Sequence, residues 1–197
     1  TNYIKINFDE YALRNNIKNL DDLYYNYAQN KGFIYAPIRK MIKFKDMKNF
    51  KTVLALRDPR DTLISHYFST VYSHDKNSIN LLEERDYYKA MNIDEFVLDK
   101  ADWLNNIMTE YMENLSNYYF INYEELIIKP HFILSGLLDY LSINIDEKKI
   151  IKFASDLIPN SNENKLKHKR SGKNNQFKTH LKDETIEILN EKFSKVI

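Results

Sequence analysis

Residues 52–65 read TVLALRDPRDTLIS, and they carry the strongest fold signal in the sequence. Its first part, Thr52–Leu56, is nearly continuously apolar, which is the pattern of a β-strand buried on both faces of a parallel sheet. Asp58 and Pro59 then give a helix start, with Asp58 as the N-cap and Pro59 at the first helical position. The segment therefore predicts a buried strand that passes almost directly into a helix.

Apolar periodicity extends this alternation along the chain. Tyr118–Asn122 is typical of a second short buried strand, and Gly32 and Pro37 bound another apolar piece, Phe33–Tyr35. Helical spacing predicts helices from Thr1 to Tyr11, over 93–115, over 124–141 with a break at Pro130, over 146–157, and from a cap at Asp183 to Phe193. The polar, basic stretch 159–176 is expected to be a loop. Together these elements predict a single three-layer α/β domain over residues 1–197, with a central, mostly parallel sheet flanked by helices.

The composition limits what such a domain can bind. Lys and Arg number 29 against 28 Asp and Glu, so the net charge of +1 creates no overall field to recruit nucleic acid or a membrane surface, and neither partner is expected. The absence of cysteine excludes disulfides and thiolate zinc sites. The most apolar stretches, Thr52–Leu56 and Phe132–Leu138, are far shorter than the roughly 20 residues of a membrane helix. Since no signal peptide is recognised either, we expect a cytoplasmic protein.

The junction between the predicted strand and helix is suited to bind an anion. Arg57 can bind phosphate in bidentate fashion, and backbone N–H groups at the positive end of the helix point to the same place. Ser65, about two turns into the helix, can add a hydroxyl donor. On local physics alone, a purely structural cluster of Arg and Asp explains the segment equally well.

The order Arg57-Asp58-Pro59-Arg60-Asp61, followed by Ser65, resembles the 3′-phosphate-binding segment of sulfotransferases that use the donor PAPS (3′-phosphoadenosine 5′-phosphosulfate). In that family the Arg and the Ser hold the 3′-phosphate of the donor. The resemblance implies the same role for Arg57 and Ser65, and a sulfotransferase fold similar to that of the P-loop nucleotide kinases. It also implies PAPS as donor, PAP (the desulfated donor) as product, and no metal.

Two later segments fit the same family. Arg170-Ser171-Gly172, followed by Phe177-Lys178-Thr179-His180-Leu181, resembles the C-terminal segment whose Arg and Gly cover the 3′-phosphate, although Ser171 and Phe177 replace the family's Lys and Trp. Without the resemblance, a solvated basic loop or a weak nucleic-acid patch would explain this stretch better. Tyr123, after the second strand, resembles the tyrosine that lies near the adenine, and a plain core tyrosine is about as good an explanation.

The N-terminal part matches the family least well. Thr1-Asn2-Tyr3 resembles the end of the loop that binds the 5′-phosphosulfate and opens a helix, with Tyr3 in the position of an adenine-stacking Trp. On this alignment the family's first strand and most of that loop precede Thr1. The stretch Phe33–Pro37 lacks the histidine that commonly acts as general base, which leaves Tyr35, Asp9 and Glu10 as candidates.

Three functions follow from the sequence. The first is sulfuryl transfer from PAPS to a hydroxyl or amine of a small-molecule acceptor. A protein that binds PAP or PAPS without catalysis, or a scaffold, is the alternative suggested by the missing base. A P-loop-type kinase would share the fold class, but its Gly-x-x-x-x-Gly-Lys signature is absent from the sequence. The acceptor and the oligomeric state are left open.

Overall fold

The computed structural model describes residues 4–6, 33–36, 38, 41, 49–73, 85–157 and 174–197. The chain divides into two compact units, Thr1–Phe50 and Lys51–Ile197. In the first unit, strand β1 (Ile4–Ile6) pairs in parallel with β2 (Phe33–Tyr35), and Ile6 lies opposite Tyr35. Among the described residues, no helix is both long and apolar enough to cross a membrane.

Strand β1 corrects the prediction of a helix that begins at Thr1. Ile4 and Ile6 flank Lys5 with the period of two that strands require, and β-branched side chains favour a strand. The spacing of the surrounding aromatic residues favours a helix, but pairing with β2 stabilises the strand instead. Thr1, Asn2 and Tyr3 lie outside the described residues and come directly before a strand in the sequence. The comparison of these three residues with a loop that opens a helix therefore loses its main support.

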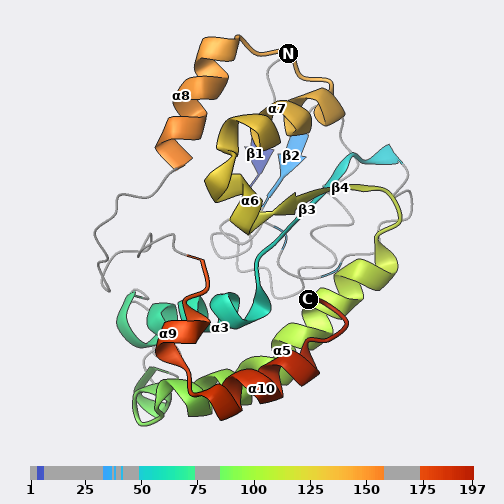
Figure 1. Cartoon of the computed structure of the whole chain (residues 1–197). Helices are drawn as coiled ribbons and strands as arrows, with labels where there is room; N and C mark the ends of the chain where they lie inside the picture. The colour runs from blue at the N-terminus through green and yellow to red at the C-terminus, as the bar shows by residue number, and fades with distance from the viewer. Residues whose placement is uncertain are drawn as a thin grey trace. The chain divides into compact units, whose positions relative to one another are not determined.

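The second unit confirms the strands and most of the helices predicted from the sequence. Strands β3 (Thr52–Leu56) and β4 (Tyr118–Asn122) pair in parallel (Figure 1). The helices are α3 (Pro59–Phe68), the π-helical turn η2 (Ser69–Ser73), α5 (Ile93–Asn114), α6 (Tyr123–Ile128), α7 (Pro130–Leu141), α8 (Glu147–Leu157), α9 (Phe177–His180) and α10 (Asp183–Lys192). The break between α6 and α7 falls at Pro130, as predicted.

Strand β3 is less buried than its apolar sequence predicts. Leu54 is buried, but Val53 is 38% exposed, and on the paired strand Phe120 is 49% exposed. Among the described residues β3 and β4 form a sheet of two strands, and within these strands only Leu54 and Ile121 are buried. The prediction of a strand buried along both faces is therefore wrong, whereas its parallel pairing is confirmed.

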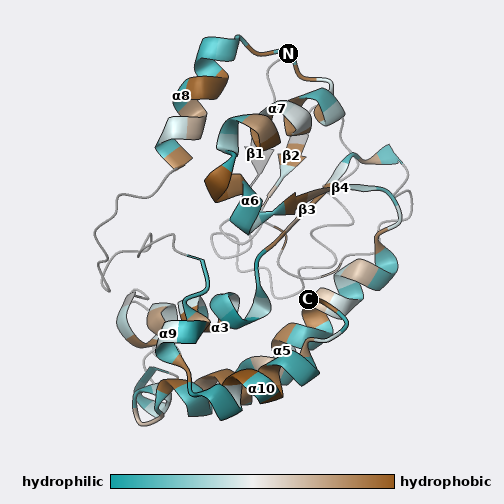
Figure 2. Cartoon of the chain, in the orientation of Figure 1, coloured by the Kyte–Doolittle hydropathy of each residue, from teal (hydrophilic) through white to brown (hydrophobic). Residues whose placement is uncertain are grey.

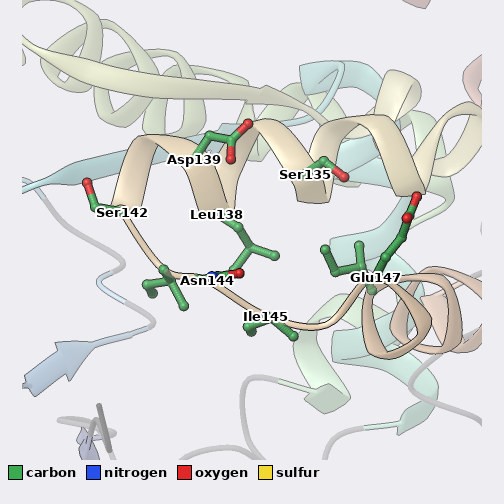
Figure 3. Close-up of a pocket in the computed structure, with 9 residues that line it drawn as sticks. Ser135, Leu138, Asp139, Ser142, Asn144, Ile145 and Glu147 are labelled. Atoms are coloured by element: carbon green, nitrogen blue, oxygen red, sulfur yellow. The ribbon is translucent and has the colours of Figure 1, made fainter.

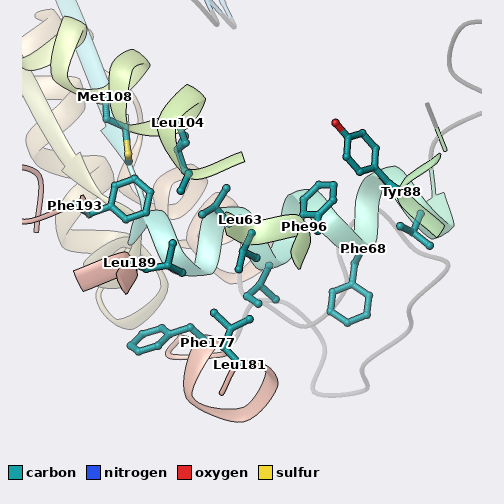
Figure 4. Close-up of a cluster of buried hydrophobic side chains, with 14 residues drawn as sticks. Leu63, Phe68, Tyr88, Phe96, Leu104, Met108, Phe177, Leu181, Leu189 and Phe193 are labelled. Carbon is teal, nitrogen blue, oxygen red and sulfur yellow. The ribbon is translucent and has the colours of Figure 1, made fainter. Parts of the chain in front are cut away.

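The main core lies among helices rather than against the sheet. It joins α3 to α5, α9 and α10, and α10 lies alongside α5 (Figure 1). Figure 2 shows brown apolar residues and teal polar residues alternating along α5 and α10, as expected of helices with one buried face. Figure 4 shows the buried side chains, which are Leu63, Ile64, Phe68, Val71, Tyr88, Phe96, Val97, Ala101, Leu104, Met108, Phe177, Leu181, Leu189 and Phe193.

The start of α10 differs from the prediction by one residue. Asp183 is the first helical residue, and the N-cap is Lys182, whose side chain has no acceptor with which to cap a helix. Instead, the carboxylate of Asp94 on α5 accepts the Lys182 N–H at 3.0 Å. This contact joins the start of α10 to α5, and α10 has no side-chain cap of its own.

Candidate functional site

The register of β3 and β4 brings two predicted site residues together. Leu56 pairs with Asn122, so the residues that follow them, Arg57 and Tyr123, leave the sheet side by side. The Arg57 guanidinium carbon lies 4.8 Å from the centroid of the Tyr123 ring, a cation–π distance. The Asp58 N–H donates to Glu124 Oε1 at 3.1 Å and fastens the two strand ends to each other.

Arg57 and Ser65 also meet, because Ser65 lies on the face of α3 that looks back to the strand end. Arg57 Nη1 donates to Ser65 Oγ at 2.7 Å. Since the serine oxygen accepts this bond, its own O–H hydrogen is left as a donor. The guanidinium and the hydroxyl are thus held as adjacent donors, an arrangement that suits the binding of a phosphate group through its oxygens.

The backbone at the start of α3 contributes less to an anion site than the sequence suggests. Pro59 has no N–H, and the Arg60 N–H donates to the Asp58 carboxylate at 2.9 Å. The Asp58 N–H is already bonded to Glu124. The first backbone donors of the helix are therefore used within the protein, and the side chains of Arg57 and Ser65 are the better donors.

We expect Asp58→Ala to lower the free energy of unfolding by about 1 kcal/mol, because the helix loses its N-cap acceptor. The Asp58 carboxylate also accepts from Arg60 Nε at 3.0 Å and Arg60 Nη2 at 2.5 Å. Urea unfolding followed by circular dichroism would measure the change. Asp58→Asn keeps a capping oxygen and should lose clearly less; an equal loss in both variants would mean that the cap is not the reason.

The structure reveals a contact to this site that sequence reasoning missed. Helix α9 packs on α3, and the Phe177 N–H donates to Asp61 Oδ1 at 3.0 Å, across 116 positions of sequence. The Phe177 ring is buried, and the Arg60 guanidinium lies 3.9 Å from its centroid. A sequence signal was present, because apolar residues lie four positions apart at Phe177 and Leu181 and again at Leu189 and Phe193.

The described side chains around Arg57 do not form a net positive site. The two guanidinium groups of Arg57 and Arg60 lie among the three carboxylates of Asp58, Asp61 and Glu124. A dianionic phosphate bound by Arg57 and Ser65 would therefore need further positive charge from elsewhere in the chain. The basic stretch that includes Arg170 is the candidate that the sequence offers.

The other predicted site residues belong to the first unit or lie outside the described residues. Tyr35 ends β2 in the unit Thr1–Phe50, whereas Arg57 belongs to the unit Lys51–Ile197. The remaining predicted residues lie outside the described residues, namely Thr1, Asn2, Tyr3, Asp9, Glu10, Arg170, Ser171 and Gly172.

A pocket of about 450 Å³ lies elsewhere in the second unit, at the turn between α7 and α8. Figure 3 shows Leu138, Asn144 and Ile145 around this turn. It contains none of the residues predicted to bind nucleotide. In the part of the chain that the structure describes, no group of three or more His, Asp or Glu side chains could hold a metal ion.

The fold and the sequence place the chain in a known class. Residues 36–197 match the sulfotransferase domain, and the chain therefore belongs to this family. The match favours a sulfotransferase over the P-loop-type kinase. A sequence search finds no match among curated proteins.

Solved sulfotransferase structures share the fold. Mouse sulfotransferase SULT7A1, solved with PAP, superposes with a TM-score of 0.60 at 17% identity over 83% of this chain. Retinol dehydratase superposes with TM-scores of 0.55 in its complex with androsterone and PAP (15% identity, 89% of this chain) and 0.54 in its complex with retinol and PAP (16% identity, 84% of this chain). The chain spans 64% of the first protein and 56% and 53% of the retinol dehydratase chains, less than two thirds of each. The predicted α/β fold with a parallel sheet, that of the sulfotransferases, is confirmed.

Proposed function

We propose that the protein is a PAPS-dependent sulfotransferase and that Arg57 and Ser65 bind the 3′-phosphate of the donor. The observation that carries the proposal is the 2.7 Å bond from Arg57 Nη1 to Ser65 Oγ, which holds the two predicted phosphate donors together at the end of a parallel strand. In open α/β sheets, ligands bind beyond the carboxyl ends of the strands, where this pair lies. Membership of the sulfotransferase domain family supports the same assignment.

The other nucleotide contacts follow from the same position. Tyr123, whose ring lies against Arg57, is proposed to lie near the adenine. The segment Arg170-Ser171-Gly172 is proposed to cover the phosphate. Its one charged residue, Arg170, would add the positive charge that is needed because three carboxylates surround Arg57. Thr1, Asn2 and Tyr3 remain candidates for the 5′-phosphosulfate end on sequence resemblance alone.

In the proposed reaction, an oxygen or nitrogen of the acceptor attacks the sulfur of PAPS. The bond from sulfur to the bridging oxygen breaks, PAP leaves, and the acceptor proton passes to a base. Tyr35, Asp9 and Glu10 are the base candidates. The acceptor is proposed to be a small molecule, supported by androsterone and retinol in the complexes of retinol dehydratase. No metal is needed for this step, in which positioning and charge stabilisation do most of the work.

We also propose that residues 1–197 form one sulfotransferase domain in the cytoplasm. The family match covers 36–197 and so crosses the boundary between the two compact units at Phe50, which supports one domain. The cytoplasmic location rests on the composition of the sequence.

The proposal predicts that PAP binds more tightly than AMP, which lacks only the 3′-phosphate. A charged hydrogen bond contributes roughly 1.5–3 kcal/mol, so the affinities should differ at least about tenfold. Isothermal titration calorimetry of each nucleotide into the full chain would measure the ratio. Equal affinities, or no binding of PAP, would contradict the proposed 3′-phosphate site.

A transfer assay separates the enzyme from the alternative of a binding protein without catalysis. The chain would be incubated with PAPS labelled on sulfur and a panel of small hydroxyl and amine acceptors. Labelled product is expected for at least one acceptor. PAP binding with no transfer to any acceptor would favour the non-catalytic alternative, which the missing histidine of Phe33–Pro37 suggests.

A further inference from the structure

Asp61 is a buried carboxylate at the centre of the candidate site. It lies in the first turn of α3 and its side chain is 0% exposed. A carboxylate at such depth requires partners on its oxygens, because its interactions with water are lost. Its partners therefore indicate what the residue does.

Two donors from distant parts of the chain meet at Asp61. Arg57 Nη2 donates to Oδ2 at 3.3 Å, and the Phe177 N–H donates to Oδ1 at 3.0 Å. An ionised carboxylate accepts on both oxygens, whereas an asparagine in the same place would turn its NH₂ group toward one of the two donors. The pair of contacts therefore requires aspartate rather than any side chain of the same shape.

The contact to Asp61 fixes the direction of the Arg57 guanidinium. Arg57 Nη1 is held by Ser65 and Nη2 by Asp61, and the Tyr123 ring lies against the group. A planar guanidinium bonded on two of its nitrogens cannot rotate freely, so less freedom is lost when an anion binds. Asp61 thus orients the residue that is proposed to bind the 3′-phosphate.

The same carboxylate joins Arg57 to helix α9. Phe177 begins α9 and is held twice, by Asp61 on its backbone and by Arg60 on its ring. Arg60 Nη1 in turn donates to Asn190 on α10 at 2.5 Å. Adjacent residues of α3 therefore connect the phosphate-binding arginine to the C-terminal helices.

We propose that Asp61 is a positioning residue for the nucleotide, which orients Arg57 for the 3′-phosphate and couples that orientation to α9. This role rests on the proposed function, because it assumes that Arg57 binds the phosphate. Asp61 itself does not touch the nucleotide. Its removal should therefore change the contribution of the 3′-phosphate to binding and leave the rest of the nucleotide contacts unchanged.

The test compares PAP and AMP binding to the wild-type chain and to Asp61→Asn by calorimetry. We expect Asp61→Asn to weaken PAP about tenfold and AMP less than about twofold, so that the ratio of their affinities shrinks. An equal loss for both nucleotides, or no loss for either, would overturn the positioning role. A wild-type chain that does not distinguish PAP from AMP would instead mean that the proposed function has failed.

Amide hydrogen exchange on the wild-type chain gives a second test that does not depend on the folding of a variant. If Asp61 couples Arg57 to α9, PAP should slow exchange of the Phe177 amide at least about fivefold, because coupling between two sites acts in both directions. The Phe193 amide, which donates to Leu189 O at 2.9 Å in the same core, is the control for overall stabilisation. A Phe177 amide that responds no more than Phe193 would overturn the coupling.

Discussion

Arg57→Ala should weaken PAP binding at least about 100-fold and leave AMP binding within about twofold of the wild type. The variant removes a guanidinium that the proposed function places on the 3′-phosphate, which AMP lacks. Two charged hydrogen bonds from one arginine to phosphate contribute roughly 1.5–3 kcal/mol each before the loss of its contact to Ser65 is considered. Calorimetric titration of both nucleotides into both proteins would measure the effect.

Two further variants make this prediction specific. Arg57→Lys keeps the charge but not the planar fork and should recover only part of the affinity. Arg85→Ala is the matched control, because Arg85 is also a partly buried arginine and donates to Val71 O at 2.9 Å, a contact outside the site. A PAP affinity that falls equally in Arg57→Ala and Arg85→Ala would show that lost stability, and not a lost phosphate contact, explains the result.

The sequence predicts the candidate site where local order and strand register determine it. The apolar run Thr52–Leu56 and the segment Tyr118–Asn122 form parallel strands with the predicted bounds. Once these strands pair in register, Arg57 and Tyr123 must leave the sheet together. Ser65 reaches Arg57 because it lies on the face of α3 that is turned toward the end of β3. The contacts of Arg57 with Tyr123 and with Ser65 need only local patterns and one strand pairing.

The contacts between segments that are distant in the sequence could not be predicted from the sequence. Asp61 fits the sulfotransferase pattern, but the N–H that it accepts comes from Phe177, which lies 116 positions further on. Likewise, a helical spacing of aromatic residues suggested a helix at Ile4–Ile6, and only pairing with Phe33–Tyr35 makes this segment a strand. Periodicity describes what one segment can bury, whereas the partner that covers it is decided by tertiary structure.

Gly136→Ala should lower the free energy of unfolding by about 2 kcal/mol, although alanine is the better helix former by roughly 1 kcal/mol. Gly136 lies within α7 where this helix packs on β4. A Cβ atom built there would overlap the hydroxyl oxygen of Tyr119. Tyr119 cannot turn away freely, because its ring packs against Tyr140 with centroids 5.4 Å apart. Urea unfolding would measure the loss.

Removing the hydroxyl that creates the overlap should reverse the sign of this effect. In a Tyr119→Phe background the nearest atom to the new Cβ is the ring carbon Cζ at 3.4 Å, an ordinary contact. The lost hydroxyl bond to Ile133 O is long, at 3.4 Å, so Tyr119→Phe alone should cost less than about 1 kcal/mol. Gly136→Ala should then stabilise the Tyr119→Phe protein by about 0.5–1 kcal/mol through helix propensity. If the alanine destabilises both backgrounds equally, the close approach of Tyr119 is not what requires glycine in α7.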